Sequence, residues 1–230
     1  MVARVAALFL AGVAVLACAA SAGAALVGIY RNGMESDGQR AQIVKLSGER
    51  CGRGGSDHAV RIVVGKRTRE CAYRTPVIGR DLEVATVGRL LSNTPKPLQR
   101  KAFLAVNVRT GGAGAGYQLA VFPLQGKAQL RKIFSDGRIE YLHIEKGVAT
   151  GGLDRANELR LRAFNLTAGP KQGTCQIVAY VGGQLVADVN DAASGELEGR
   201  ASGFSLGAIG SAKGVVGSFD DVVVRVPAPS

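Results

Sequence analysis

The stretch NELRLRAFNLTAGPKQGTCQIVAYVGGQLVADVND, residues 157–191, indicates a β fold. In its first run, Leu159 and Leu161 alternate with Arg160 and Arg162, which is the period of a strand with one buried face. The second run reverses at VGGQLV, where paired glycines favour a tight turn. We therefore expect a strand followed by a hairpin.

The same pattern continues through most of the chain. Alternating or β-branched runs recur between residues 41 and 226, separated by Gly, Pro, Asn or Asp. Helix signals are weak, because Pro95 and Pro97 interrupt the best stretch, VGRLLSNTPKPLQRK. The fold class that we predict is all-β: a two-sheet antiparallel β-sandwich of the jelly-roll type, forming one domain over residues 31–230 with a short flexible C-terminal tail.

The N-terminus predicts export. Residues 5–30, VAALFLAGVAVLACAASAGAALVGIY, carry no charge and follow Arg4. Residues 1–30 could be an uncleaved signal anchor, since they are long enough to span a bilayer, or a signal peptide cleaved after ASA at residues 20–22. Either way we expect the domain outside the cytoplasm, membrane-anchored or secreted.

The cysteines support the same location. Cys51 and Cys71 flank a strand-like stretch, and their separation suits a hairpin-closing disulfide in an oxidising compartment. Cys175 lies at an alternating position and is interpreted as a small buried hydrophobe. No C-x-x-C is present and the only histidines are His58 and His143, so we predict no metal site and no cofactor.

The charge favours a polyanionic partner. The net charge is +11, with 29 basic and 18 acidic residues. The cations are spread along the chain, so an ordinary soluble basic surface is the alternative. Export, 5% aromatic residues and the absence of tryptophan disfavour a nucleic-acid partner.

Alternation gives a candidate ligand face. Polar side chains on the strand faces opposite the apolar ones would form a cationic, hydrogen-bonding concavity that suits an acidic glycan or a phosphorylated envelope polymer. The alternative is the solvated side of an ordinary sheet. The candidate residues are Asn107, Arg109, Gln118, Arg131, Tyr141, His143, Glu145, Arg160 and Arg162.

Two charged pairs pose separate questions. Arg160 and Arg162 project from one side of a strand, so either Glu145 neutralises them or an anionic ligand can. Asp220 and Asp221, near the last strand, could help to hold calcium, or one could cap a turn while the other is solvated.

The chain also resembles a known superfamily. The order of GYQLAVFP, SDGRIEYLHIEKG, NELRLRAFN, YVGGQLVADVND, the glycine-spaced EGRASGFSLGAIGSAKGVVGSFDD and VVVRV is similar to the closing half of concanavalin A-like lectin/glucanase domains. The resemblance covers residues 101–226 and implies a jelly roll, with lectins, glycosidases and adhesion modules among its functions. With the stretch ECAYRTPVIGRDLEVAT, residues 70–86, before the sandwich core, the whole chain also resembles a type of uncharacterised membrane-anchored bacterial protein.

Catalytic signals are weak. The glucanase branch uses an E-x-D-x-x-E pattern, but here Glu35 and Asp37 are followed by Arg40 in place of the second glutamate. No G-x-S-x-G is present. We therefore predict a non-catalytic extracytoplasmic binding or surface module. The alternatives are a glucanase-like carbohydrate-active hydrolase and a structural or assembly subunit of the cell envelope.

Overall fold

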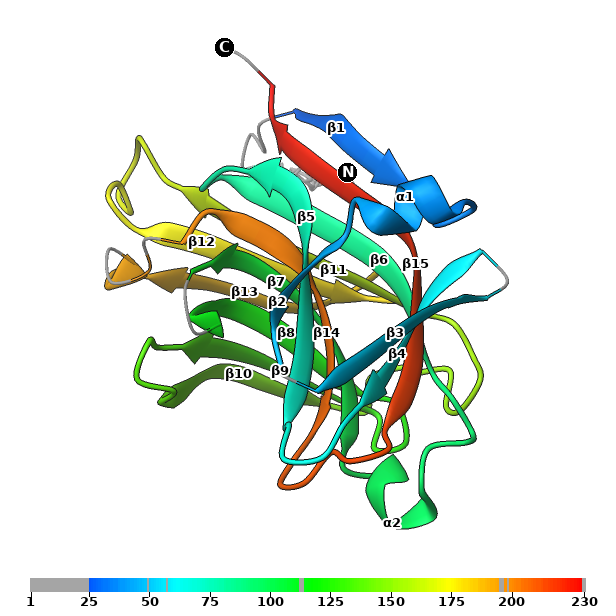
Figure 1. The fold of residues 1–230 in the computed structure, drawn as a ribbon. Coiled ribbons are helices and arrows are strands. Elements are labelled where there is room, and N and C mark those ends of the chain that lie inside the picture. The colour runs from blue at the N-terminus through cyan, green and yellow to red at the C-terminus, as the bar shows by residue number, and fades with distance from the viewer. Residues whose placement is uncertain are drawn as a thin grey trace, which may run out of the picture.

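The computed structural model describes residues 25–48, 50–56, 58–111, 114–194, 197 and 199–228. They form two stacked sheets of antiparallel strands with two short helices at the periphery (Figure 1). This confirms the predicted all-β, two-sheet fold class.

The eight-stranded sheet has the order β13-β12-β11-β6-β15-β4-β3, and β1 pairs with β15 beside this path. Its strands are β1 (Leu26–Asn32), β3 (Cys51–Ser56), β4 (Ala59–Val64), β6 (Leu82–Leu90), β11 (Asn157–Asn165), β12 (Cys175–Val181), β13 (Gln184–Asp191) and β15 (Val216–Pro227).

The seven-stranded sheet has the order β10-β9-β8-β7-β14-β5-β2. Its strands are β2 (Val44–Ser47), β5 (Glu70–Ile78), β7 (Ala102–Thr110), β8 (Gly116–Phe122), β9 (Lys127–Ile133), β10 (Ile139–Lys146) and β14 (Ala201–Ala208). Helix α1 (Asp37–Ala41) begins after Ser36, whose hydroxyl accepts a hydrogen bond from the Gln39 amide, and α2 (Lys96–Gln99) begins after Pro95.

The core lies between the sheets and follows the predicted alternation. Leu159 and Leu161 of β11 are fully buried, as are Leu104 and Val106 of β7. Strand β7 is nevertheless buried along its whole length, and on its outer face two of its residues belong to a second apolar cluster. That cluster contains Phe103, Ala105, Ala120 and Phe122.

The disulfide pairing is confirmed, but its predicted place across a hairpin is wrong. Cys51 and Cys71 are bonded, with their Cα atoms 5.8 Å apart. Cys51 begins β3, which forms its hairpin with β4, whereas Cys71 lies on β5 of the other sheet. The bond therefore joins the two sheets. Cys175 is a free, buried thiol, as predicted, and burial raises its pKa to about 11.

The predicted end of the N-terminal segment, at residue 30, lies too far along the chain. Residues 26–30 belong to β1, which pairs with the end of β15, so the sandwich includes them (Figure 1). The proposed span and cleavage site in residues 1–24 lie outside the described residues. Within the described part of the chain, no helix has the length and apolar character needed to cross a membrane.

Candidate functional site

A groove of about 460 Å³ lies on the outer face of the seven-stranded sheet; we call it the outer groove. Cross-strand register places three of the predicted residues side by side on its floor. Asn107 of β7 pairs with Gln118 of β8, which pairs with Arg131 of β9. Paired residues in adjacent strands point to the same face, so these three side chains form one polar row.

A hydrogen-bond network locks this row in place. Gln118 Nε2 donates to Asn107 Oδ1 at 3.0 Å and to Glu70 Oε1 at 2.7 Å, and Asn107 Nδ2 donates to Ser205 Oγ at 3.1 Å. Arg131 Nη1 donates to Gln118 Oε1 at 3.1 Å. Since each amide is bonded on both its oxygen and its nitrogen, the side-chain orientations on the floor are fixed before any ligand arrives.

Arg131 is the charged centre of the groove. Its guanidinium carbon lies 4.9 Å from the ring centroid of Phe103, 5.5 Å from that of Phe122 and 5.9 Å from that of Tyr141. The residue is only 5% exposed. Burial lowers its pKa, whereas the nearby Glu70 carboxylate raises it.

Glu70 is a site residue that the sequence analysis missed. It is the first residue of β5, directly before Cys71, and it lines the groove at the end away from Tyr141. Burial raises its pKa, and the hydrogen bond from Ser205 and the positive charge of Arg131 oppose that rise. No local pattern marks Glu70, because it reaches the groove through the pairing of β5 with the distant strand β14.

The rim of the groove is apolar and open. Tyr141 is 52% exposed, and Ile139 and Ile209, which also line the groove, are about half exposed. An aromatic ring with a free face next to hydrogen-bonding groups can pack against one side of a flat ligand.

His143 and Glu145 do not join Tyr141. The register of β10 against β9 shifts between Tyr141 and His143, so Tyr141 pairs with Arg131 but His143 pairs with the core-facing Leu130. This bulge turns His143 and Glu145 to the opposite face, where His143 Nε2 lies 3.2 Å from Glu145 Oε2. The predicted grouping is therefore wrong for these two residues.

Arg160 and Arg162 lie on the outer face of the other sheet. Arg162 Nη2 bonds Glu83 Oε2 at 3.0 Å, and Arg225 bonds the other oxygen of Glu83 at 2.7 Å. Arg160 stacks 4.0 Å from the ring centroid of Tyr180. The expected single cationic face is thus split between two sheets, and Glu83, not Glu145, neutralises Arg162.

Arg109 also leaves the predicted face. Its φ of 53° lies in the left-handed region, at a bulge where Val108 and Arg109 oppose Ser202 of β14. Its side chain turns toward the other sheet, where Nη2 bonds Asp81 Oδ1 at 3.1 Å and Asn165 Oδ1 at 2.8 Å. Arg109 is 2% exposed and links the sheets.

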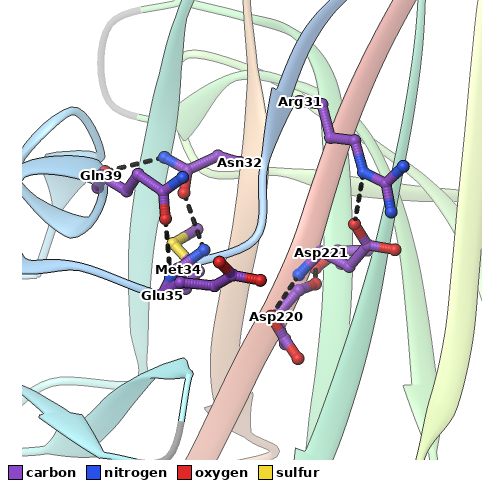
Figure 2. Close-up of polar contacts among 8 residues, drawn as sticks. Arg31, Asn32, Met34, Glu35, Gln39, Asp220 and Asp221 are labelled. Carbon is purple, nitrogen blue, oxygen red and sulfur yellow. Dashed lines mark hydrogen bonds and ion pairs between the residues drawn. The ribbon is translucent and has the colours of Figure 1, made fainter.

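A second cavity, of about 470 Å³, lies where β15 stops pairing with β4 and begins to pair with β1. Figure 2 shows Arg31 Nε bonded to Asp221 Oδ1 at 3.1 Å, and Asp220 Oδ1 accepting from the Asp221 amide at 2.6 Å. Both carboxylates thus have protein partners. Within the described residues, no group of three or more His, Cys, Asp or Glu side chains could hold a metal ion.

The wall of this cavity is a loop organised by Asn32. Its Nδ2 donates to the Gln39 carbonyl at 2.7 Å and its Oδ1 accepts from the Met34 amide at 2.9 Å. The Glu35 amide donates to Gln39 Oε1 at 2.7 Å (Figure 2). These bonds satisfy the loop's backbone, which identifies Asn32 as a structural residue.

Comparison with known proteins identifies the fold. No family model and no curated protein matches this chain. A Bacillus subtilis protein of unknown function with a galectin-like fold has a TM-score of 0.56 at 12% identity, over 90% of this chain and 98% of its own. The Emp46p carbohydrate recognition domain has a TM-score of 0.56 at 12% identity, over 86% and 95%. The carbohydrate binding module CBM66 from Bacillus subtilis has a TM-score of 0.50 at 14% identity, over 80% and 92%. At these identities the likeness establishes a concanavalin A-like jelly roll and nothing beyond the fold.

Proposed function

We propose that this chain is a non-catalytic saccharide-binding module and that its ligand lies in the outer groove. The observation that carries the proposal is the fixed polar row of Asn107, Gln118 and Arg131 beneath an open groove whose rim exposes Tyr141. Two proteins with this fold are named as a carbohydrate binding module and a carbohydrate recognition domain, which supports the ligand class.

The chemistry of the groove suits a pyranose. A sugar ring has an apolar face that can pack on the exposed Tyr141 ring, and hydroxyls that donate and accept around its edge. Arg131 and Asn107 each keep an N–H that donates to no other described residue, while Glu70 supplies an acceptor. Because these groups are already positioned, little conformational entropy is lost on binding.

The number of carboxyl groups in the outer groove favours binding over hydrolysis. Retaining and inverting glycosidases use a pair of carboxyl groups on either side of the scissile bond. Among the described residues that line the outer groove, Glu70 is the one carboxylate. Glu70, whose pKa is raised by burial, provides one of the two carboxyl groups that hydrolysis requires.

We further propose that the domain works outside the cytoplasm, anchored or secreted, where an acidic glycan or envelope polymer is its partner. The disulfide between Cys51 and Cys71 supports an oxidising compartment. The uncharged residues 5–25 support export. Fractionation of cells that express the full chain, with and without a protease applied from outside, tests this location.

The test of the function is binding of the full chain to a panel of neutral and acidic polysaccharides, measured by calorimetry. Tyr141→Ala should weaken binding about tenfold or more, since exposed aromatic anchors contribute over about 1 kcal/mol to such interfaces. Tyr180→Ala is the matched control, because Tyr180 also lies under an arginine but on the other sheet. Equal effects of the two variants, or no binding to any polysaccharide, would refute the proposal.

A further inference from the structure

A basic pocket adjoins the outer groove. It has a volume of about 390 Å³ and is lined by Gly48, Arg50, Lys66, Arg67, Thr68, Arg69 and Glu70. We use the name basic pocket for the cavity formed by these residues. Arg69 and Glu70 also line the outer groove, so the two cavities share a wall.

Local structure holds the cations of this pocket together. Lys66, Arg67 and Arg69 lie in the turn that joins β4 to β5, and Arg67 has a φ of 61° that brings the chain round sharply. Arg50 precedes β3, which the Cys51–Cys71 disulfide attaches to β5. Two segments of sequence are therefore held side by side by a covalent bond.

Close packing reinforces this arrangement at Gly48. Its φ is 96°, and a Cβ at this position would collide with Cys51 Sγ and with the Glu70 carbonyl. Only glycine allows the chain to pass so close to the disulfide. The wall of the basic pocket next to Glu70 is thus held by the disulfide and by close packing at Gly48.

Among the described residues that line the pocket, four are cationic and one is acidic. Arg50, Lys66, Arg67 and Arg69 are exposed, and none of them forms an ion pair with another described residue. Glu70, the carboxylate on the shared wall, is instead bonded to Gln118 and lies near Arg131. Four cations around one cavity repel one another, and an anionic group between them would remove that repulsion.

We propose that the outer groove and the basic pocket form one elongated site for an acidic polysaccharide. This inference rests on the proposed function. One sugar ring packs on Tyr141 above the polar row, and a carboxylate or sulfate group further along the polymer enters the basic pocket past Arg69. The rim at Tyr141 thus recognises the saccharide, and the basic pocket selects its acidic class.

The experiment compares polymers that differ only in charge. Polygalacturonate is compared with the same polymer after methyl esterification of its carboxylates, and dextran sulfate with dextran, which separates carboxylate from sulfate recognition. We expect the full chain to bind at least one acidic polymer about tenfold more tightly than its neutral counterpart, because the weak contributions of several new exposed ion pairs add up. The preference should shrink at high salt.

Two triple variants locate the effect. Lys66→Gln, Arg67→Asn and Arg69→Gln together should abolish most of the acidic preference. Lys146→Gln, Arg155→Gln and Lys171→Gln remove the same charge from exposed residues outside both cavities and should retain it. Asparagine is chosen at residue 67 because it tolerates a left-handed φ.

The outcomes separate this inference from the proposed function. If neither acidic polymer is preferred, or if both triple variants lose the preference equally, the inference is wrong, while a Tyr141→Ala effect on the neutral polymers would keep the proposed function. If acidic polymers depend on the basic pocket but not on Tyr141, the two cavities act separately and the single elongated site is refuted. If no polymer binds, both proposals fail.

Discussion

Arg131 and Arg109 show how this sandwich keeps two arginines out of solvent. Arg131 is surrounded by three aromatic rings and hydrogen-bonds Gln118 and Gln129. Arg109 instead pairs with Asp81 and Asn165 across the gap between the sheets. Both are satisfied, which is the condition for burying a cation at an acceptable cost in free energy.

Glu70 should make stability depend on pH. Its folded pKa is raised above the usual value of 4.5 by burial, so the unfolded chain gives up this proton first as pH increases. The contribution of the protonated carboxyl is complete below pH 4.5 and is lost as pH rises through the folded pKa. We therefore expect Glu70→Gln to become more stable relative to the wild type as pH rises through the folded pKa of Glu70.

Urea unfolding of both proteins from acidic to neutral pH measures this difference. Glu158→Gln is the control, because Glu158 is exposed on β11. A difference between Glu70→Gln and the wild type that stays constant across the pH range would show that burial does not perturb this carboxyl.

At the scale of strands, two bulges decide which residues share a face. The shift in β10 separates Tyr141 from His143, and the shift between β7 and β14 turns Arg109 away from Asn107. One extra residue reverses every side chain beyond it, since the strand period is two. Strict alternation therefore failed at these two positions and held along β11.

The bulge in β7 gives a stability prediction. Strict alternation puts Arg109 on a solvated face, where truncation has little effect, but the structure buries it beside Asp81. Arg109→Ala should reduce the free energy of unfolding by about 2–4 kcal/mol, because it leaves Asp81 and Asn165 without their charged partner.

Arg80→Ala is the neighbouring control and should change stability by less than about 0.5 kcal/mol, since Arg80 is exposed. Chemical denaturation of both variants measures the difference. A loss for Arg109→Ala as small as that for Arg80→Ala would contradict the inter-sheet role.

At the scale of the whole molecule, the two sheets are joined by more than apolar packing. The disulfide links β3 to β5, and Arg109 links β7 to Asp81, the residue before β6. A third link lies at Asp191 of β13, whose Oδ2 accepts from Tyr117 at 2.6 Å and pairs with Lys132 at 2.8 Å. These bonds fix one sheet relative to the other and so support the floor of the groove.

Removal of the disulfide should affect both stability and binding. The Cys51→Ser, Cys71→Ser double variant should lose about 3 kcal/mol of unfolding free energy, as expected for a crosslink that closes a loop of this size. Because Cys71 directly follows Glu70 and attaches Arg50 to the same region, polysaccharide affinity should fall as well.

Unfolding and binding are measured with and without reductant. The wild type should approach the double variant when reduced, whereas the double variant should not respond. A wild type whose stability is unchanged by complete reduction would show that packing and the other two links suffice.

The sequence by itself determined the fold class, because local side-chain chemistry sets the period of each strand. Leu159 and Leu161 alternate with arginines, and VGGQLV supplies the hairpin turn. Three strands lack a clear local pattern: β1 continues the apolar N-terminal stretch, β3 contains three glycines, and β5 contains Pro76. The pairing of Cys51 with Cys71 was also predictable from composition and spacing.

Only the tertiary structure decided which residues form the site. Asn107, Gln118 and Arg131 were predicted from alternation, and cross-strand register brings them together. Arg160 and Arg162 have the same local pattern but lie on the other sheet, because the strand order, which no local period encodes, separates β11 from β7. Glu70 joins the groove through pairing of β5 with β14, a contact between residues more than a hundred positions apart. Local periodicity tells which way a side chain points, and long-range pairing determines what it meets.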